Sequence, residues 1–321
     1  MATVLLTDIA WPDCQLEEEL LAATGHKLIW RDTNARSEGH VLALCREHQP
    51  DAIMTCWAPV SEASIDSVPN LRLIQRLGIG LDNIDVEAAT RHGCWVANVP
   101  GYCAEEVSDH AVAMLMSLAR DLPRINASVR SGIWDPALVK ARRVCSLTIG
   151  LLGYGSIAQA IARKLNGLGC SILAHNRSGV VAGPARYAPL DEMLATSDAV
   201  IVLAPLNAGT RHLLDEAAFA QMRTGSFLIN VSRGAIVSND ALIRALADGR
   251  IAGAGLDVID GEPDIPPLLL ADPRVIVTPH VAFSSAESLI DMKLAVCEEV
   301  ARVLGGEPPR QACNRLQETA Y

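Results

Sequence analysis

Short apolar runs alternate with longer amphipathic segments along most of the chain. Between about residues 145 and 280 these runs are apolar on both faces, as in parallel strands that helices cover on each side. They read LTIGLLG, SILAHN, DAVIVLAP, SFLINVS, IAGAGLDV and RVIVTPH. Helical spacing is found between them, at Ile157–Leu168, Ala217–Met222 and Asp240–Asp248. This alternation predicts a doubly wound parallel sheet in an α/β fold.

The first hundred residues repeat a looser version of the same alternation. Its strand-like runs are TVLLTD, KLIWR, DAIMTC, LRLIQR and WVANVP, which predict a second, smaller Rossmann-like α/β domain of flavodoxin type. Two long helices are expected at AEEVSDHAVAMLMSLARDL and SAESLIDMKLAVCEEVARVLGG, one before and one after the larger unit, as a double hinge. We therefore expect residues 101–283 to form one domain, inserted into a smaller domain made of residues 1–100 and 284–321.

Composition narrows the class of protein. Of 321 residues, 50% are hydrophobic and 20% charged, and the net charge of −10 argues against a nucleic acid partner. The nine cysteines are scattered without metal-binding spacing, which predicts reduced thiols in a cytoplasmic protein and no metal site. The N-terminus lacks a basic region typical of a signal peptide. The uncharged run from Val144 to Ala162 contains several glycines, so a strand, a turn and a helix are expected there rather than a membrane span.

A glycine-rich turn follows the first strand of the larger unit. Gly153, Gly155 and Ala158 form a GxGxxA pattern between a buried strand and an amphipathic helix, which is typical of a dinucleotide-binding loop. The next strand ends in Asn176, where NAD-binding proteins commonly carry an acid that repels a 2′-phosphate. Because Arg177 follows and suits a phosphate, we expect NADP(H) to be preferred and NAD(H) to be possible. The alternative is that Arg177 is a solvated surface charge.

Three later strands end in, or are followed by, side chains that could take part in catalysis. Arg233 follows SFLINVS, Asp257 ends IAGAGLD with Glu262 in the next loop, and His280 ends RVIVTPH. Parallel strands end at one edge of a sheet, so these side chains are expected beside the glycine loop. There Arg233 would hold a carboxylate, and His280 would exchange a proton with a carbonyl oxygen while Glu262 favours its charged form. Asp257 is expected near the nicotinamide amide.

Each of these residues also has a structural interpretation. His280 could cap a strand, Glu262 could be an exposed turn residue, and Arg233 could neutralise a buried acid. All three residues are expected at the same edge of the sheet, which favours the catalytic interpretation. Structural roles are expected for the other histidines near the predicted site, which are His110, His175 and His212. Candidates for lining a substrate pocket are Trp57, Tyr102, Trp134 and Phe283.

Several motifs occur in an order that is similar to one enzyme family. GIGLDNID, GYGSIAQAIA, NVSRGAIV, GAGLDVIDGEP and VTPH resemble the D-2-hydroxyacid dehydrogenase (D-isomer specific) family over essentially the whole chain. NVPGYCAEEVSDHAVAMLMSLAR and TPHVAFSSAESL look most like the branch containing the C-terminal binding protein corepressors and bacterial relatives. Phe283 departs from that branch, which often has tryptophan there.

The resemblance implies roles for particular residues. It implies that Arg233, Glu262 and His280 are catalytic, and that Arg233 and His280 bind substrate together with the backbone around Ile79 and Gly80. It also implies a homodimer built through the nucleotide domain, and closure of the smaller, substrate-binding domain over the cleft. The residues expected to contact the dinucleotide are Gly153, Gly155, Ser156, Ile157, Asn176, Arg177, Ser178, Ala204, Pro205, Thr210, Val231, Ser232 and Asp257.

Two functions of different kinds remain at this point. The first is an oxidoreductase that reduces small 2-keto acids, such as glyoxylate or hydroxypyruvate, to D-2-hydroxy acids, with no nucleic acid or membrane partner. The alternative is a dehydrogenase-like, nucleotide-sensing interaction protein of the corepressor type. Oxidation of formate or phosphite is disfavoured, because formate-oxidising relatives replace the carboxylate partner of the histidine by an amide and Glu262 is intact.

Overall fold

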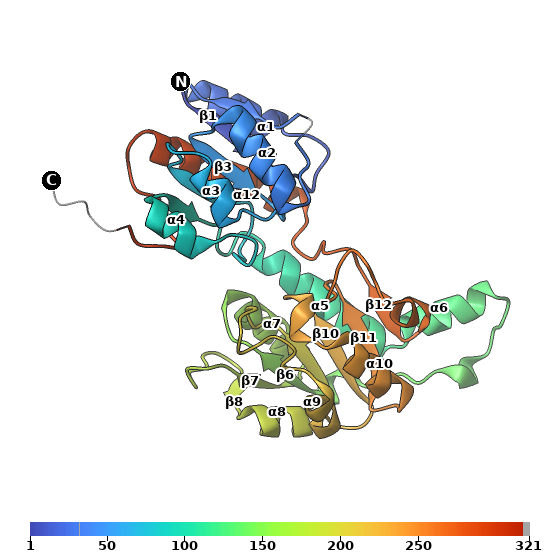
Figure 1. The fold of residues 1–321 in the computed structure, drawn as a ribbon. Helices are drawn as coiled ribbons and strands as arrows, with labels where there is room; N and C mark the ends of the chain where they lie inside the picture. Colours follow the sequence, from blue (N-terminus) through green and yellow to red (C-terminus); the bar gives the residue numbers. More distant parts are fainter. Residues whose placement is uncertain (32, 317–321) are drawn as a thin grey trace. The chain divides into compact units, whose positions relative to one another are not determined.

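The computed structural model describes residues 1–31 and 33–316. The chain divides into two compact units. Unit 1 comprises Met1–Tyr102 and the segment that begins at Ser285, and unit 2 comprises Cys103–Ser284. Each has a parallel sheet with helices on both faces (Figure 1).

Unit 1 is built on a five-stranded sheet in its described part. The strands are β1 (Thr3–Leu6), β2 (Lys27–Ile29), β3 (Ala52–Thr55), β4 (Leu73–Arg76) and β5 (Trp95–Ala97), and the order β2-β1-β3-β4-β5 is typical of flavodoxin-like folds. The register pairs Val4 with Ala52 and Ile53 with Ile74. Its helices are α1 (Gln15–Ala23), α2 (Glu38–His48), α3 (Glu62–Asp66), α4 (Val86–His92) and α12 (Ala286–Leu304).

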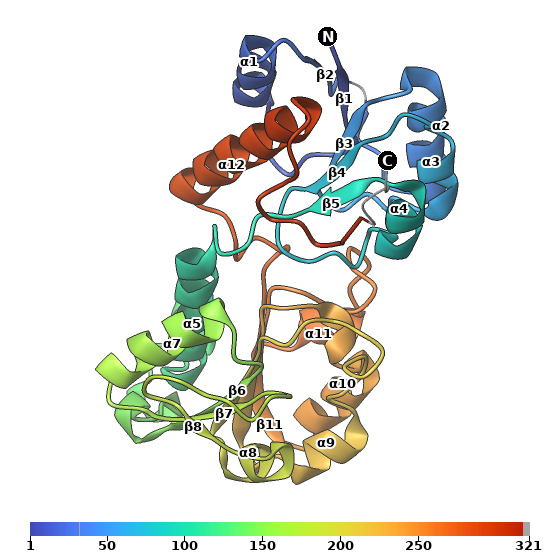
Figure 2. The same cartoon turned by 90° about the vertical axis from the view of Figure 1, so that its left-hand side faces the viewer.

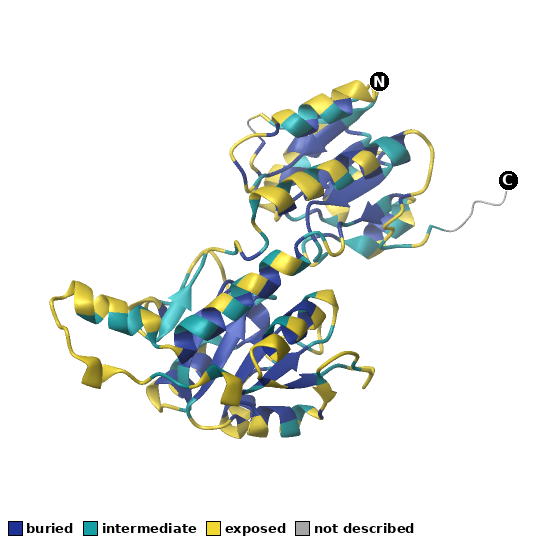
Figure 3. Cartoon of the chain, turned by 180° about the vertical axis from the view of Figure 1, so that it is seen from behind, coloured by how far each residue is buried: buried dark blue, intermediate teal, exposed yellow. Residues whose placement is uncertain are grey.

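Alternating side chains of these strands enter two hydrophobic cores. Val4 and Met54 pack with α1 and α12 on one face, whereas Leu5 and Ile53 pack with α2, α3 and α4 on the other. Figure 2 shows α1 and α12 on one side of this sheet and α2, α3 and α4 on the other. Figure 3 shows the buried residues gathered on the strands and on the inner helix faces. Burial on both faces explains why these strands read as continuous apolar runs.

Unit 2 holds a seven-stranded parallel sheet in the described chain. Its strands are β6 (Thr148–Leu152), β7 (Ser171–His175), β8 (Arg186–Tyr187), β9 (Ala199–Val202), β10 (Ser226–Asn230), β11 (Ile251–Leu256) and β12 (Val275–Val277). The order β12-β11-β10-β9-β6-β7-β8 is the Rossmann order with one strand added, and the chain reverses direction across the sheet between β6 and β9. Its helices are α5 (Ala104–Ala119), α6 (Leu122–Arg130), α7 (Ser156–Gly167), α8 (Leu190–Thr196), α9 (Glu216–Gln221), α10 (Asn239–Ala247) and α11 (Pro267–Ala271).

The predicted fold class is confirmed, and α6 and β8 are among the elements that the sequence pattern did not predict. The run from Val144 to Ala162 contains β6, the glycine turn and the start of α7, and none of the described helices is long and apolar enough to cross a bilayer. The long helix expected to reach Leu122 ends at Ala119, because Asp121 has a φ of 59° and breaks it. α6 then begins at Leu122 and, within the described chain, buries none of its own residues. β8 is a two-residue edge strand with exposed side chains.

Candidate active site

The carboxyl ends of the strands of unit 2 bring the predicted residues to one edge of its sheet. Arg233 follows β10, Asp257 follows β11, and His280 comes after β12. These three strands are neighbours and parallel, with Asn230 opposite Leu256 and Leu256 opposite Val277. The glycine loop follows β6 at the same edge. The structure therefore places Arg233, Asp257, His280 and the glycine loop at one edge of the sheet, where Nη1 of Arg233 donates to the Ser232 carbonyl oxygen over 2.8 Å.

His280 and Glu262 form a close pair at this edge. The Nδ1 atom of His280 lies 2.7 Å from Oε1 of Glu262, and the amide of Ile259 donates to the other carboxylate oxygen over 3.1 Å. The side chains are 23% and 40% exposed, respectively, so solvent and small molecules can reach the pair. His280 has a φ of 55°, a left-handed conformation that costs energy in a residue with a Cβ atom. Such strain is found most often at functional sites.

The ionisation of Glu262 reflects this arrangement. Partial burial acts to raise its pKa, but the hydrogen bond with His280, the charge of His280, the amide of Ile259 and the charge of Arg233 together outweigh it. The pKa of Glu262 is therefore lowered, and the side chain is a carboxylate at neutral pH. A carboxylate in this position accepts the Nδ1 proton of His280, which orients the other ring nitrogen, Nε2, for proton exchange.

The turn that carries Arg233 is fixed by two residues beside it. Asn230, 1% exposed, donates from Nδ2 to the carbonyl oxygen of Arg233 over 3.0 Å and accepts from the amide of Ser232. A Cβ atom on Gly234 would lie 2.0 Å from the carbonyl carbon of Ile259. Only glycine permits this approach, so the Arg233 turn packs directly against the segment that leads to Glu262.

The side chain of Asp257 forms hydrogen bonds within the fold. Its side chain is 2% exposed and accepts hydrogen bonds from the Thr278 hydroxyl at 2.6 Å and from the amides of Val281 and Ala282, each at 2.9 Å. These bonds hold the turn that contains His280. Contact of Asp257 with a nicotinamide amide remains a prediction.

Two histidines, for which structural roles were expected, make side-chain contacts next to the site. Nε2 of His212 lies 2.7 Å from Oδ2 of Asp260, and so tethers the loop of Glu262. Nε2 of His110 lies 3.0 Å from Oγ1 of Thr278. The sequence pattern did not single out Asp260 or Thr278, because their partners His212 and His110 are distant in the chain, nor Asn230, which holds the adjacent turn. The third histidine, His175, contacts the carbonyl oxygen of Ala188 through Nδ1 at 3.2 Å.

The loop after β6 fits a dinucleotide phosphate. Gly153 has a φ of 100°, and a Cβ atom there would lie 2.6 Å from the amide nitrogen of Ala204. Gly155 precedes α7, whose first turn receives no side-chain cap from the described residues, and a Cβ atom on Gly155 would meet no described atom within 4 Å. Ala158, in the first turn of α7, is 1% exposed and lies on the buried face of the helix. Open space beside uncapped amides at a helix N-terminus suits a pyrophosphate.

The end of β7 carries a second feature that fits a dinucleotide. Oδ1 of Asn176 is buried and accepts no hydrogen bond from the part of the chain that the structure describes, while Nδ2 donates to the Val180 carbonyl oxygen. An acceptor of this kind suits a ribose hydroxyl, since a buried oxygen without a donor is costly. Arg177 and Ser178 follow and are exposed.

The other residues expected at the cofactor lie in the loops after β9 and β10. Thr210 donates from Oγ1 to the carbonyl oxygen of Pro205 at 2.7 Å, and Ser232 donates from Oγ to that of Ala204. These bonds shape both loops at the carboxyl edge. The cofactor contacts assigned to these residues and to Val231, Ser156 and Ile157 stay predictions.

In unit 1, Ile79 and Gly80 follow the carboxyl end of β4 and are half-buried. Nδ2 of Asn98 donates to the Ile79 carbonyl oxygen over 2.7 Å, which fixes this loop. The loop after the neighbouring strand β3 is fixed by the buried carboxylate of Asp8. This carboxylate accepts hydrogen bonds from the amides of Cys56 and Trp57 at 2.9 and 2.7 Å. Trp57 itself is 41% exposed.

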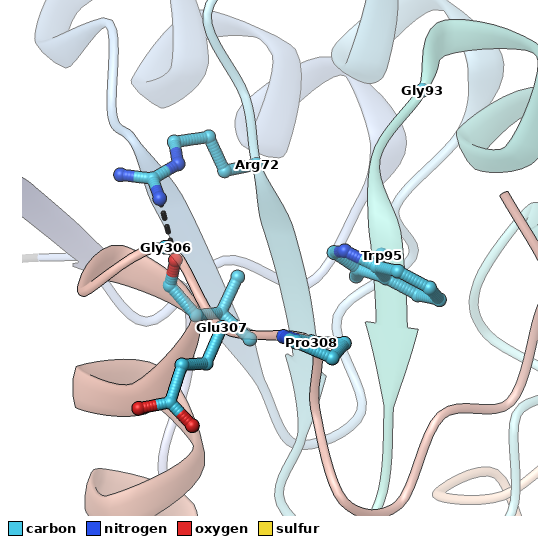
Figure 4. A pocket seen from close by; sticks show the side chains of 7 residues that line it. Arg72, Gly93, Trp95, Gly306, Glu307 and Pro308 are labelled. Atoms are coloured by element: carbon cyan, nitrogen blue, oxygen red, sulfur yellow. Dashed lines mark hydrogen bonds between the residues drawn. The ribbon is translucent and has the colours of Figure 1, made fainter. Parts of the chain in front are cut away.

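A cavity of about 310 Å³ lies elsewhere in unit 1, at the amino ends of β4 and β5 (Figure 4). Arg72 in its wall donates to the carbonyl oxygens of Val303 and Leu304 at the end of α12. Glu307, also in the wall, is paired with Arg302 at 2.7 Å. The charged side chains in the wall of the cavity, Arg72 and Glu307, thus bind other groups of the fold. We assign no reaction to this cavity.

Comparison with known proteins agrees with this architecture. Residues 112–282 match the model of the D-isomer specific 2-hydroxyacid dehydrogenase NAD binding domain. A glyoxylate reductase from Thermococcus litoralis is 33% identical over 299 residues, which cover 89% of this chain and 90% of that protein. A hydroxypyruvate reductase from Thermotoga maritima is 33% identical over 245 residues, covering 75% of this chain and 80% of that protein.

Solved structures of 2-hydroxyacid dehydrogenases and reductases are also similar to this chain over nearly its whole length. The NADPH-dependent glyoxylate/hydroxypyruvate reductase of Sinorhizobium meliloti, in complex with NADP and malonate, has a TM-score of 0.84 and 28% identity, with 97% of this chain and 96% of that chain covered. The D-lactate dehydrogenase of Aquifex aeolicus, with NAD and lactic acid, has a TM-score of 0.84 and 26% identity, with 95% and 96% covered.

Fold, site and similarities together define an NAD(P)-dependent oxidoreductase. The chain belongs to the D-isomer specific 2-hydroxyacid dehydrogenase family. The finer similarity to the corepressor-containing branch stays a prediction.

Proposed function

We propose that this protein reduces small 2-keto acids, among them glyoxylate and hydroxypyruvate, to D-2-hydroxy acids, and that it prefers NADPH. The observation that carries the proposal is the pair formed by His280 and Glu262, 2.7 Å apart, next to the turn of Arg233. Relatives named glyoxylate reductase and hydroxypyruvate reductase, at 33% identity, support this substrate class. We assign substrate binding to unit 1 and dinucleotide binding to unit 2.

The bound nicotinamide supplies the hydride in this reaction. His280 gives a proton from Nε2 to the carbonyl oxygen of the keto acid, while Nδ1 stays hydrogen-bonded to Glu262. Arg233 binds the substrate carboxylate through its planar guanidinium and polarises the adjacent carbonyl group. In unit 1, we assign substrate binding to the backbone around Ile79 and Gly80. In the reverse direction His280 takes the proton back.

The preference for NADPH rests on the end of β7. Asn176 brings no negative charge to the place where a 2′-phosphate would lie, and the exposed guanidinium of Arg177 provides a partner for that phosphate. The S. meliloti relative is described as NADPH-dependent, which supports this choice. NADH remains a possible, weaker cofactor, because Oδ1 of Asn176 can still accept from a ribose hydroxyl.

We further propose a homodimer that uses the segment from α6 to residue 143. This segment has large apolar side chains on its surface, with Trp134 85% exposed, Leu122 53% and Ile133 51%. Figure 3 colours most of α6 and the following loop as exposed. Such a concentration of exposed apolar groups marks an interaction surface. A second copy of the chain is the occupant that this family resemblance implies.

The test is the oxidation of NADPH by the purified protein with glyoxylate, hydroxypyruvate and pyruvate, followed by absorbance. We expect turnover with at least one of the first two acids, and D-glycerate as the product from hydroxypyruvate by chiral chromatography. The variant His280→Ala serves as the negative control. Tight NADPH binding without oxidation by any of the three acids would contradict the proposal.

A further inference from the structure

His110 lies on α5, the helix that packs on β10 and β11, and its ring is 25% exposed. Its Nε2 atom is 3.0 Å from Oγ1 of Thr278, the residue that follows β12. Two residues separated by 168 positions in the chain therefore meet directly at the edge of the sheet that carries His280.

The donors and acceptors of this contact can be assigned. Oγ1 of Thr278 lies 2.6 Å from Oδ1 of Asp257. A carboxylate only accepts, so the single hydroxyl proton goes to Asp257, and Nε2 of His110 must carry a hydrogen that it donates to Thr278. The direction of donation is thus from His110 to Thr278 to Asp257. Such chains strengthen each bond, because each donor is polarised by the next acceptor.

Asp257 in turn determines the conformation of the turn that contains His280. Its carboxylate accepts from the amides of Val281 and Ala282, and its own carbonyl oxygen accepts from the amide of His280 at 2.9 Å. The φ of 55° at His280 is unfavourable for a residue with a side chain, so it persists only when neighbouring bonds hold it. A change in the hydrogen bonds of Asp257 therefore alters the conformation of the turn that contains His280.

We propose that His110 is a positioning residue for the reaction: through Thr278 and Asp257 it holds the turn that aims His280 at the substrate. This inference rests on the proposed function. His110 acts through its contacts with Thr278 and Asp257. Loss of its hydrogen bond leaves the Thr278 oxygen without a donor and loosens the turn, which lowers the rate of proton transfer more than the affinity for the keto acid.

The test compares two replacements of His110. In His110→Leu the donor is lost, and we expect kcat to fall about three- to tenfold with KM for the keto acid nearly unchanged, as for the loss of one hydrogen bond. In His110→Gln, Nε2 of the amide can donate to Thr278, and we expect kcat within about twofold of the parent. Thr278→Val should resemble His110→Leu, and the double variant should be no slower than the slower single variant.

The matched control is His92→Leu. His92 is also a partly buried helical histidine, with ring nitrogens 3.1 Å from the Val68 carbonyl oxygen and 3.8 Å from Oδ1 of Asp66 in unit 1. We expect it to change Tm without changing kcat. Equal kcat values for His110→Leu and His110→Gln, or an additive loss in the double variant, would overturn the proposal.

A second readout needs no turnover. Hydrogen exchange at the amides of Val281 and Ala282 should be faster in His110→Leu than in His110→Gln, because these amides are held by Asp257. If the parent protein reduces no keto acid but exchange follows this order, the proposed function fails while the positioning network stands. Unchanged exchange at both amides in His110→Leu refutes the network itself.

Discussion

Nδ1 of His280 and Oε1 of Glu262 lie 2.7 Å apart, although 18 residues separate them in the chain. The pair joins the loop after β11 to the turn after β12, and the amide of Ile259 holds the second carboxylate oxygen. An imidazole held by a carboxylate in this way has a fixed orientation, which is what proton exchange with a bound carbonyl group requires.

Replacement of the carboxylate should slow the reaction strongly. In Glu262→Gln we expect kcat to fall about a hundredfold, within the usual range for general acid–base catalysis, because the amide no longer stabilises a charged His280. The measurement is steady-state NADPH oxidation with glyoxylate. A variant with a parental kcat would show that the pair is structural only.

The same substitution gives a pH-dependent difference in stability. The pKa of Glu262 is lowered in the folded protein from an ordinary value of 4.5, so its carboxylate stabilises the fold above that pH. We expect the parent to exceed Glu262→Gln in free energy of unfolding at neutral pH, and the difference to disappear as pH falls below 4.5 through the lowered pKa. Urea unfolding across this pH range measures it. Glu298→Gln, which removes an exposed ion pair with Arg310, should show little difference at any pH.

Gly234 should not tolerate a side chain. A Cβ atom there would lie 2.0 Å from the carbonyl carbon of Ile259, so Gly234→Ala must displace the segment leading to Glu262. We expect a loss of about 1–3 kcal/mol in stability together with a marked fall in kcat. Thermal unfolding and NADPH oxidation measure the two effects. Gly167→Ala in α7, where a Cβ atom would meet no described atom within 4 Å, should leave both unchanged or slightly raise stability.

Substitutions at the end of β7 should change the preference for NADPH over NADH. In Asn176→Asp a negative charge would face the 2′-phosphate of NADP, so kcat/KM for NADPH should fall about ten- to a hundredfold while that for NADH rises. Arg177→Ala should lower use of NADPH without improving use of NADH. The ratio of the two kcat/KM values is the measurement, and a ratio unmoved by both changes would contradict the assignment.

The exposed apolar residues after α6 should control assembly. In the double variant Ile133→Glu and Trp134→Glu we expect a monomer, because two charges would replace side chains that are 51% and 85% exposed and available for burial between copies. Light scattering after size-exclusion chromatography gives the mass. Leu168→Glu, a change of an apolar side chain that is 42% exposed at the end of α7, should leave the assembly intact.

Much of the fold and part of the site could be predicted from the sequence. Strands such as β9 and β10 are buried on both faces, and that burial leaves a continuous apolar run that can be read directly. Gly153 indicates a dinucleotide loop because its φ of 100° and the close approach of Ala204 require glycine there, and Gly155 leaves open space before α7. Arg233, Glu262 and His280 were predicted to lie together because parallel strands end at one edge. By contrast β8 is too short and exposed to leave a pattern.

The sequence by itself determined the α/β class, the glycine loop and the residues at the strand ends, because each follows from local periodicity or local backbone demands. Only the tertiary structure decided which side chains touch. It linked His110 to Thr278 and His212 to Asp260, and it showed Asp257 holding the His280 turn. These contacts join segments that are distant in the chain, and hydrogen bonds between such segments leave no period in the sequence.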